Sequence, residues 1–170
     1  MSYSSATDNF GKIIHSGLMD IFDAEFPRDH IVHQPEFRPQ DLARRNEYIR
    51  VYPGDSSQLE AGAMYEARAY NYQLSFYKQF SGEELEKTFE DVISQKWNHI
   101  YFYLMGFRNY EPATGYVWHN IVFEDVSGVL WGIEDEEGYD EVGHIDATVS
   151  FWRTNEFELT ELALGGGLGL

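Results

Sequence analysis

The hydrophobic pattern is clearest over residues 65–104, and its period changes partway along that stretch. The first half alternates apolar and polar side chains, which is the period of a half-buried strand. The alternating apolar positions are Tyr70, Tyr72, Leu74 and Phe76. We therefore predict a long strand over Tyr65–Gln79.

The second half of this stretch has the pattern of an amphipathic helix. Ser81 and Glu84 have the spacing of a capping box, in which the two side chains satisfy the first amide groups of a helix. Apolar residues then follow at helical spacing: Leu85, Phe89, Val92, Ile93, Trp97, Ile100 and Leu104. The pattern predicts a helix from about Gly82 to Leu104, with Gly106 as a suitable stop.

A first helix is predicted near the N-terminus. Thr7 or Asp8 is a suitable cap, and the helix is expected to end near Pro27. One face of this helix is apolar and is formed by Phe10, Ile13, Ile14, Leu18, Ile21 and Phe22. His15 falls next to that face, as a boundary residue.

The chain between the first helix and the long strand predicts a loop and then a hairpin. Residues 27–46 contain three prolines and no clear period, which indicates an extended loop with at most a short strand at residues 30–33. Residues 47–52 alternate and predict a strand. Pro53 and Gly54 then indicate a turn over residues 53–57, because proline presets φ and glycine accepts positive φ. We expect an antiparallel hairpin with a wide loop.

The last third predicts strands around an acidic loop. Residues 116–126 are rich in β-forming side chains, and residues 128–133 suit a short strand. Residues 134–141 form an acidic loop, and residues 144–152 alternate as a final strand. The fold class is therefore α+β: two helices packed on one mainly antiparallel sheet, in the order α-β-β-α-β-β, with extended loops and a C-terminal arm.

We expect one domain over residues 1–170. Residues 1–7 would form an N-terminal arm, residues 8–153 the α+β core, and residues 154–170 a glycine-rich C-terminal arm.

Charge is distributed unevenly along the chain. The net charge is −17, and residues 111–170 contain 13 acidic residues but a single basic one, Arg153. Such a surface repels duplex DNA, so sequence-specific DNA binding is not expected. An acidic face can serve solubility alone. It also suits a basic partner, or the wall of a channel through which DNA passes without sticking.

Two further properties narrow the function. No apolar run approaches the ~18 residues that cross a bilayer, and the N-terminus lacks the features of a signal peptide, so we expect no membrane partner. The chain has no cysteine, which excludes disulfides, thiolate nucleophiles and cysteine-bound zinc.

Candidate metal ligands occur in two places. His30 and His33, with Glu36 nearby, lie in a proline-bounded loop and would face opposite ways on a strand, so we interpret them as surface histidines. Residues 134–141 lack the alternating ligand positions of a calcium-binding loop and suit a solvated hairpin loop. No serine lies in a nucleophile motif, and the terminal glycines have no helix after them to bind phosphate. We expect no catalytic residue, metal or cofactor.

The order of elements resembles that of the tail terminator proteins of long-tailed bacteriophages, the lambda-type family. The resemblance covers residues 8–152. It rests on the first helix, the strand at residues 48–52, the long strand at residues 69–77, the capped helix, and the late strand at residues 146–152 after an acidic loop. The chain departs from the smaller members in its longer segment 109–143 and in its glycine-rich tail.

The resemblance implies a structural protein of the virion. It would form a hexameric ring that caps the tail tube, joins the head–tail connector and lets genomic DNA pass, after assembly in the host cytoplasm. Contacts would come from the loops and the tail. The candidate interface residues are His30, His33, Phe37, Arg44, Arg45, Glu134, Asp135, Glu136, Glu137, Asp140, Glu141, Phe157, Leu159 and Leu168.

Two other functions are compatible with the residues. The acidic last third suits a binding module that mimics DNA toward a basic partner. A small enzyme with an unrecognised site would instead show a pocket with converging histidines and carboxylates.

Overall fold

A computed structural model describes residues 5–26, 31–32, 47–80, 86–132 and 141–156. Two helices and six strands follow one another within these residues. Their bounds are α1 (Ser5–Glu25), β1 (Ile31–Val32), β2 (Glu47–Ala61), β3 (Tyr65–Gln79), α3 (Glu86–Gly106), β4 (Asn120–Glu124), β5 (Leu130–Trp131) and β6 (Val142–Glu156).

The described strands form one sheet in the order β1-β2-β3-β6-β4, and β5 also pairs with β6. All neighbours are antiparallel except β1, which runs parallel to β2 over two residues. The three strands at the centre, β2, β3 and β6, each have 15 residues. The expected α+β class with a mainly antiparallel sheet is confirmed. The two-residue strands β1 and β5 lie within residues 30–33 and 128–133, where the sequence suited short strands.

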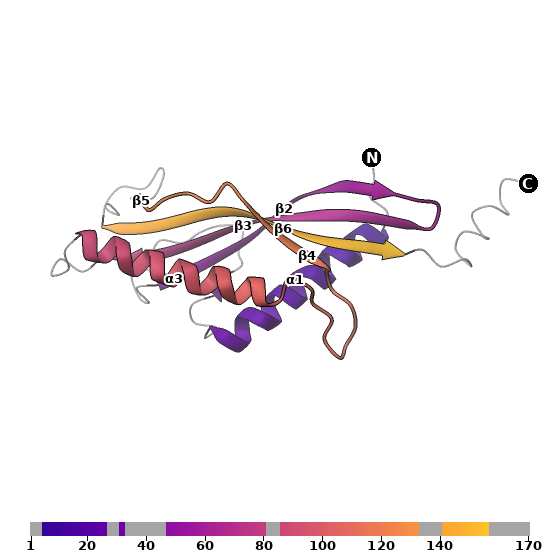
Figure 1. The fold of residues 1–170 in the computed structure, drawn as a ribbon, viewed down its shortest axis with the longest axis horizontal. Coiled ribbons are helices and arrows are strands. Elements are labelled where there is room, and N and C mark those ends of the chain that lie inside the picture. Colours follow the sequence, from indigo (N-terminus) through magenta and orange to yellow (C-terminus); the bar gives the residue numbers. More distant parts are fainter. Residues whose placement is uncertain (1–4, 27–30, 33–46, 81–85, 133–140, 157–170) are drawn as a thin grey trace, which may run out of the picture.

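Both helices lie on the same face of the sheet (Figure 1). The alternation in β3 turns every second side chain toward them, so that Tyr72 and Leu74 are buried beside the helices. Each helix contributes one apolar stripe: Ile14, Leu18, Ile21 and Phe22 from α1, and Phe89, Ile93, Trp97, Ile100 and Leu104 from α3. The core is therefore a single layer between the sheet and the two helices.

One glycine in β6 lets α3 approach the sheet closely. A Cβ on Gly143 would collide with the side chains of Ile93 and Phe89. A larger residue there would force the side chains of α3 to shift, because packed cores have little free space.

The predicted turn at residues 53–57 is wrong. These residues lie inside β2, which continues to Ala61 opposite β3. Two register shifts, between Pro53 and Ser56 and between Gln58 and Glu60, absorb the irregular residues as bulges. Pro53 lies at the first of these shifts, and β1 pairs with β2 only as far as Arg50, so the proline is at a bulge and on the edge of the described sheet, the places where strands tolerate proline. The chain reverses at residues 62–64 instead.

Other boundaries also move. The strand expected over residues 116–126 is confined to β4, since Tyr116 and Val117 precede it in a loop. The final strand is longer than expected and reaches Glu156, because β3 offers it a partner along its whole length. The expected strand Tyr65–Gln79 and the helix stop at Gly106 are confirmed.

Candidate functional site

Three large apolar side chains are exposed where the β2–β3 hairpin closes, at one end of the sheet. There the closed end of the β2–β3 hairpin reaches past both helices (Figure 1). Leu59, Met64 and Tyr65 are 46%, 39% and 37% exposed. We call these three residues the hairpin tip. A folded chain gains nothing from exposing such a group, so it suits a contact with another molecule.

The hairpin tip has a defined conformation. The amide of Gly62 donates to the carbonyl of Tyr65 at 2.9 Å, and the Tyr65 hydroxyl donates to Glu60 Oε1 at 2.7 Å. This hydrogen bond, together with the charge of Glu60, raises the pKa of Tyr65. A Cβ on Gly62 would collide with the Tyr65 ring, so only glycine allows the ring to fold over the turn. A preformed tip loses less conformational freedom when it binds.

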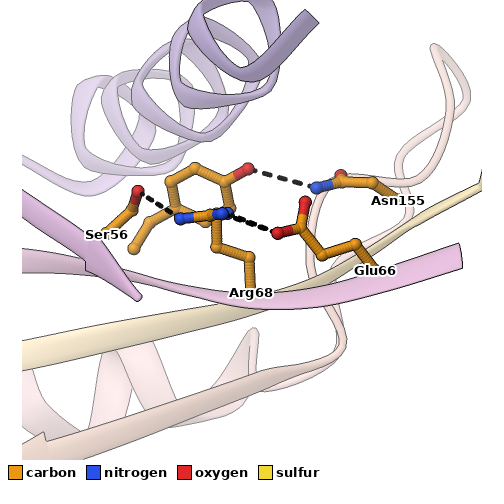
Figure 2. Close-up of polar contacts among 5 residues, drawn as sticks. Ser56, Glu66, Arg68 and Asn155 are labelled. Atoms are coloured by element: carbon orange, nitrogen blue, oxygen red, sulfur yellow. Dashed lines mark hydrogen bonds and ion pairs between the residues drawn. The ribbon is translucent and has the colours of Figure 1, made fainter. Parts of the chain in front are cut away.

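Behind the tip, polar side chains tie β2, β3 and β6 together (Figure 2). Arg68 Nη2 lies 2.6 Å from Glu66 Oε1, and Arg68 Nη1 donates to Ser56 Oγ at 3.1 Å. Asn155 Nδ2 donates to the Tyr70 hydroxyl at 3.2 Å. This network of two groups, one joining β2 to β3 and the other joining β3 to β6, stiffens the projecting end of the sheet.

Arg153 lies beside this network and is only 9% exposed. Its Nη1 donates to the carbonyls of Tyr116 at 2.7 Å and Val117 at 2.8 Å, and its Nε donates to Asn155 Oδ1 at 2.9 Å. Burial lowers the pKa of Arg153. Its guanidinium also lies over the ring of Phe10 in α1, 5.2 Å from the centroid.

The burial of Arg153 affects the charge of the surface. It is the single basic residue among residues 111–170. Because its charge is turned inward, the surface contributed by the described part of that segment carries acidic residues without an exposed lysine or arginine.

The sheet face opposite the helices carries rows of side chains across β2, β3 and β6. The rings of Tyr77 and His144 stack with centroids 5.0 Å apart, and Tyr48 meets Tyr77 edge-on at 6.2 Å. His144 Nε2 also lies 3.2 Å from Oδ2 of Asp146, which belongs to the next row. Burial opposes ionisation of Asp146, but hydrogen bonds from His144 and Ser75 and the charges nearby outweigh it, so the pKa of Asp146 is lowered.

This pKa shift gives a pH-dependent prediction. A carboxyl whose folded pKa lies below the ordinary 3.8 adds stability above that pH and loses it as the pH falls through the folded pKa. Asp146→Asn is therefore expected to destabilise the protein near neutral pH, with a difference that shrinks below about pH 4.

An NMR titration of the Asp146 carboxyl measures the shift directly. His144→Gln removes one of the groups that favour the ionised form, so it should raise the pKa of Asp146. A pKa that does not change in this variant would show that the contact with His144 has no electrostatic effect.

A pocket of about 210 Å³ lies where α1 ends, between α3 and β2. Its charged residues are already paired: His99 Nε2 lies 2.7 Å from Glu25 Oε1, and Lys96 Nζ lies 3.6 Å from Glu47 Oε1. Its floor is formed by Phe26, Ile49, Phe76 and Ile100. Because each carboxylate in the pocket has a basic neighbour, we assign the pocket no reaction.

Neither a metal site nor a membrane-spanning helix is found within the described residues. No group of three or more histidine and carboxylate side chains within them could hold a metal ion. Within the same residues, no helix is long and apolar enough to cross a membrane.

Most of the interface residues predicted from the sequence fall outside the part of the chain that the structure describes. Glu141 is the exception: it is exposed, and its carbonyl accepts a hydrogen bond from the Phe80 amide at 2.7 Å. The hairpin tip was not predicted. Its one sequence signal is the pair of apolar residues Leu59 and Met64 in an otherwise small or polar stretch.

No protein-family model matches the chain, and no curated protein matches it.

Proposed function

We propose that the protein is a structural subunit of a bacteriophage tail, of the tail terminator or a related neck class. In this function it forms a ring, six copies in the expected case, on the end of the tail tube and offers its other side to the head–tail connector. The ring is part of the virion, and it acts through contacts rather than catalysis.

The hairpin tip is the observation that carries this proposal. Three large apolar side chains are exposed together on a stiff, projecting end of the sheet. An oligomer uses such a surface to bury apolar area between copies, which is the main favourable contribution to association. The two-layer α+β architecture also agrees with the fold that the resemblance implies.

The distribution of charge supports passage of DNA through the ring. With Arg153 buried, the described part of residues 111–170 has no exposed basic side chain that would hold phosphate. A lumen lined by this surface would repel DNA and let it slide.

The proposal is tested by the assembly state of the purified protein. Light scattering and electron microscopy should show a closed ring, and the ring should bind purified tail-tube protein. A chain that stays monomeric at all concentrations and does not bind the tube protein would overturn the proposal.

Polar substitutions at the hairpin tip should weaken assembly without unfolding the protein. The double variant Leu59→Ser, Met64→Ser removes apolar area that we expect to be buried between copies, so the concentration needed for assembly should rise at least about tenfold, which corresponds to roughly 1.4 kcal/mol. Sedimentation over a concentration series measures this.

A matched control is available elsewhere on the surface. Val126 and Leu130 are 46% and 44% exposed, like Leu59, but Val126 lies between β4 and β5 and Leu130 begins β5. Val126→Ser, Leu130→Ser should leave assembly unchanged. If the two double variants behave alike, the effect is not specific to the hairpin tip.

The burial of Arg153 also favours a second function, an acidic module that mimics DNA toward a basic protein. This function needs no ring. A monomer that competes with DNA for a purified basic DNA-binding enzyme would support it in place of the first.

A further inference from the structure

The segment that connects α3 to β4, residues 107–119, projects from the body of the molecule and returns to it (Figure 1). Tyr110 and Trp118 pair across its base, and the Tyr110 amide donates to the carbonyl of Trp118 at 2.9 Å. Trp118 is 0% exposed, so the base is fixed in the core. Residues 111–116 lie beyond this base, and we call them the 111–116 loop.

Tyr116 joins the 111–116 loop to β6. Its hydroxyl accepts a hydrogen bond from the Thr154 amide at 3.1 Å and lies 2.9 Å from Nδ1 of His119. The guanidinium of Arg153 lies over the Tyr116 ring, 4.8 Å from the centroid. We call the hydrogen-bonded group of Tyr116, His119 and Thr154 the tyrosine clip.

The geometry of the tyrosine clip requires a neutral histidine. The Tyr116 oxygen is already the acceptor for the Thr154 amide, so its single proton is the one that lies between the hydroxyl and His119. Nδ1 of His119 therefore accepts, which an imidazole nitrogen does only when it carries no proton. In the imidazolium ion both nitrogens are donors. Protonation would direct an N–H group at the hydroxyl proton, and this hydrogen bond would be lost.

Charged groups from several elements surround the clip. Arg153 of β6 disfavours a second positive charge beside it, whereas Glu111 of the loop and Glu156 of β6 favour one. Phe10 of α1, which packs on the Arg153 guanidinium, carries no charge. Arg108, after the end of α3, is held by Asn120 Oδ1 at 2.7 Å.

Solvent reaches the histidine of the clip. His119 is an exposed residue, so its ring can exchange protons with water. The part of the ring that is shielded from water is less able to carry a charge, and this desolvation lowers the pKa of His119.

We propose that the tyrosine clip is a pH-sensitive fastening, which holds the 111–116 loop on β6 at neutral pH and releases it when His119 is protonated. The released loop would pivot at the buried Trp118, and Arg153 would lose the carbonyl of Tyr116 as an acceptor. This inference concerns a single chain and does not depend on the proposed ring.

The direction of the pH dependence follows from the lowered pKa. A histidine whose folded pKa lies below the ordinary 6.5 binds a proton less readily in the closed clip than in the released one. The closed clip is therefore most stable above pH 6.5, and it loses stability as the pH falls below that value toward the folded pKa of His119.

Hydrogen exchange of the Thr154 amide tests the proposal, because that amide donates to the Tyr116 hydroxyl. NMR measures its protection factor, corrected for the intrinsic effect of pH on exchange, at about pH 7.5 and about pH 5. The protection of Thr154 should fall at the lower pH relative to that of Val149, which lies in the centre of β6.

Two variants separate the titration from the hydrogen bond. His119→Asn places an amide oxygen close to the position of Nδ1, so it accepts from the hydroxyl but does not titrate. Thr154 should then have the same protection at both pH values. Tyr116→Phe keeps the ring beside Arg153 but removes the acceptor, so Thr154 should exchange fast at both.

His99→Gln is the matched control. His99 is also exposed, but it pairs with Glu25 at the end of α1, so this variant should respond to pH as the wild-type chain does. A protection of Thr154 that does not fall in the wild-type chain, or a fall that persists in His119→Asn, would overturn the tyrosine clip. Either result leaves the proposed ring untouched.

Discussion

Replacing Trp118 with alanine is expected to lower the free energy of unfolding by about 3–5 kcal/mol. Trp118 is 0% exposed, and its ring packs against Tyr110 at 5.0 Å and Phe151 at 4.7 Å. Its Nε1 also donates to the carbonyl of Phe107 at 2.7 Å, just after α3 ends. The substitution leaves a cavity and an unpaired carbonyl, and both costs add to the lost burial. Urea denaturation followed by fluorescence or circular dichroism measures the change.

Trp152→Ala is the matched control for this prediction. Trp152 lies in β6 on the sheet face opposite the helices and is only partly buried. The same change of side chain should therefore cost clearly less there. Equal losses at the two positions would contradict the placement of Trp118 at the centre of the core.

Arg153→Met is expected to cost about 2–4 kcal/mol in the free energy of unfolding. Methionine fills similar space but donates nothing, so the carbonyls of Tyr116 and Val117 lose their partner. The chain leading from α3 into β4 is held against β6 by these hydrogen bonds. Hydrogen exchange of residues 116–124 should therefore accelerate as the stability falls.

Two further variants show whether the hydrogen bonds or the charge matter. Arg153→Lys keeps the charge but loses the planar fork of donors, so it should recover only part of the stability. Arg108→Met removes an exposed arginine that donates to Asn120 Oδ1 at 2.7 Å, and it should cost less than about 1 kcal/mol. A loss at Arg108 equal to that at Arg153 would contradict the importance of burial.

The fold was predicted well wherever a strict period was present. The alternation of Tyr70, Tyr72, Leu74 and Phe76 predicted β3 with its observed bounds, because backbone geometry alone decides that successive strand side chains face opposite ways. The turn at Pro53 was wrong for the opposite reason. Proline and glycine favour turns locally, but pairing with β3 holds the chain extended, and bulges absorb the misfit.

The candidate site was not predicted, because its components are unremarkable in the sequence. Leu59 is followed by four small or acidic residues before the adjacent pair Met64 and Tyr65, and the three form no motif. They come together only because the chain reverses at residues 62–64. Phe102 likewise belongs to a helix whose other Phe, Tyr and Trp residues are buried or partly buried, and its exposure depends on which face of α3 meets the sheet.

The sequence by itself determined the periodic elements, the two apolar helix faces and the acidic character of the last third, since these depend on local spacing and composition. Only the tertiary structure decided that Arg153 turns inward, that β2 continues through Pro53, and that the hairpin tip and Phe102 remain exposed. Those properties depend on which strands pair and on which side chains then come into contact. Contacts between residues far apart in the sequence leave no local pattern from which they could be predicted.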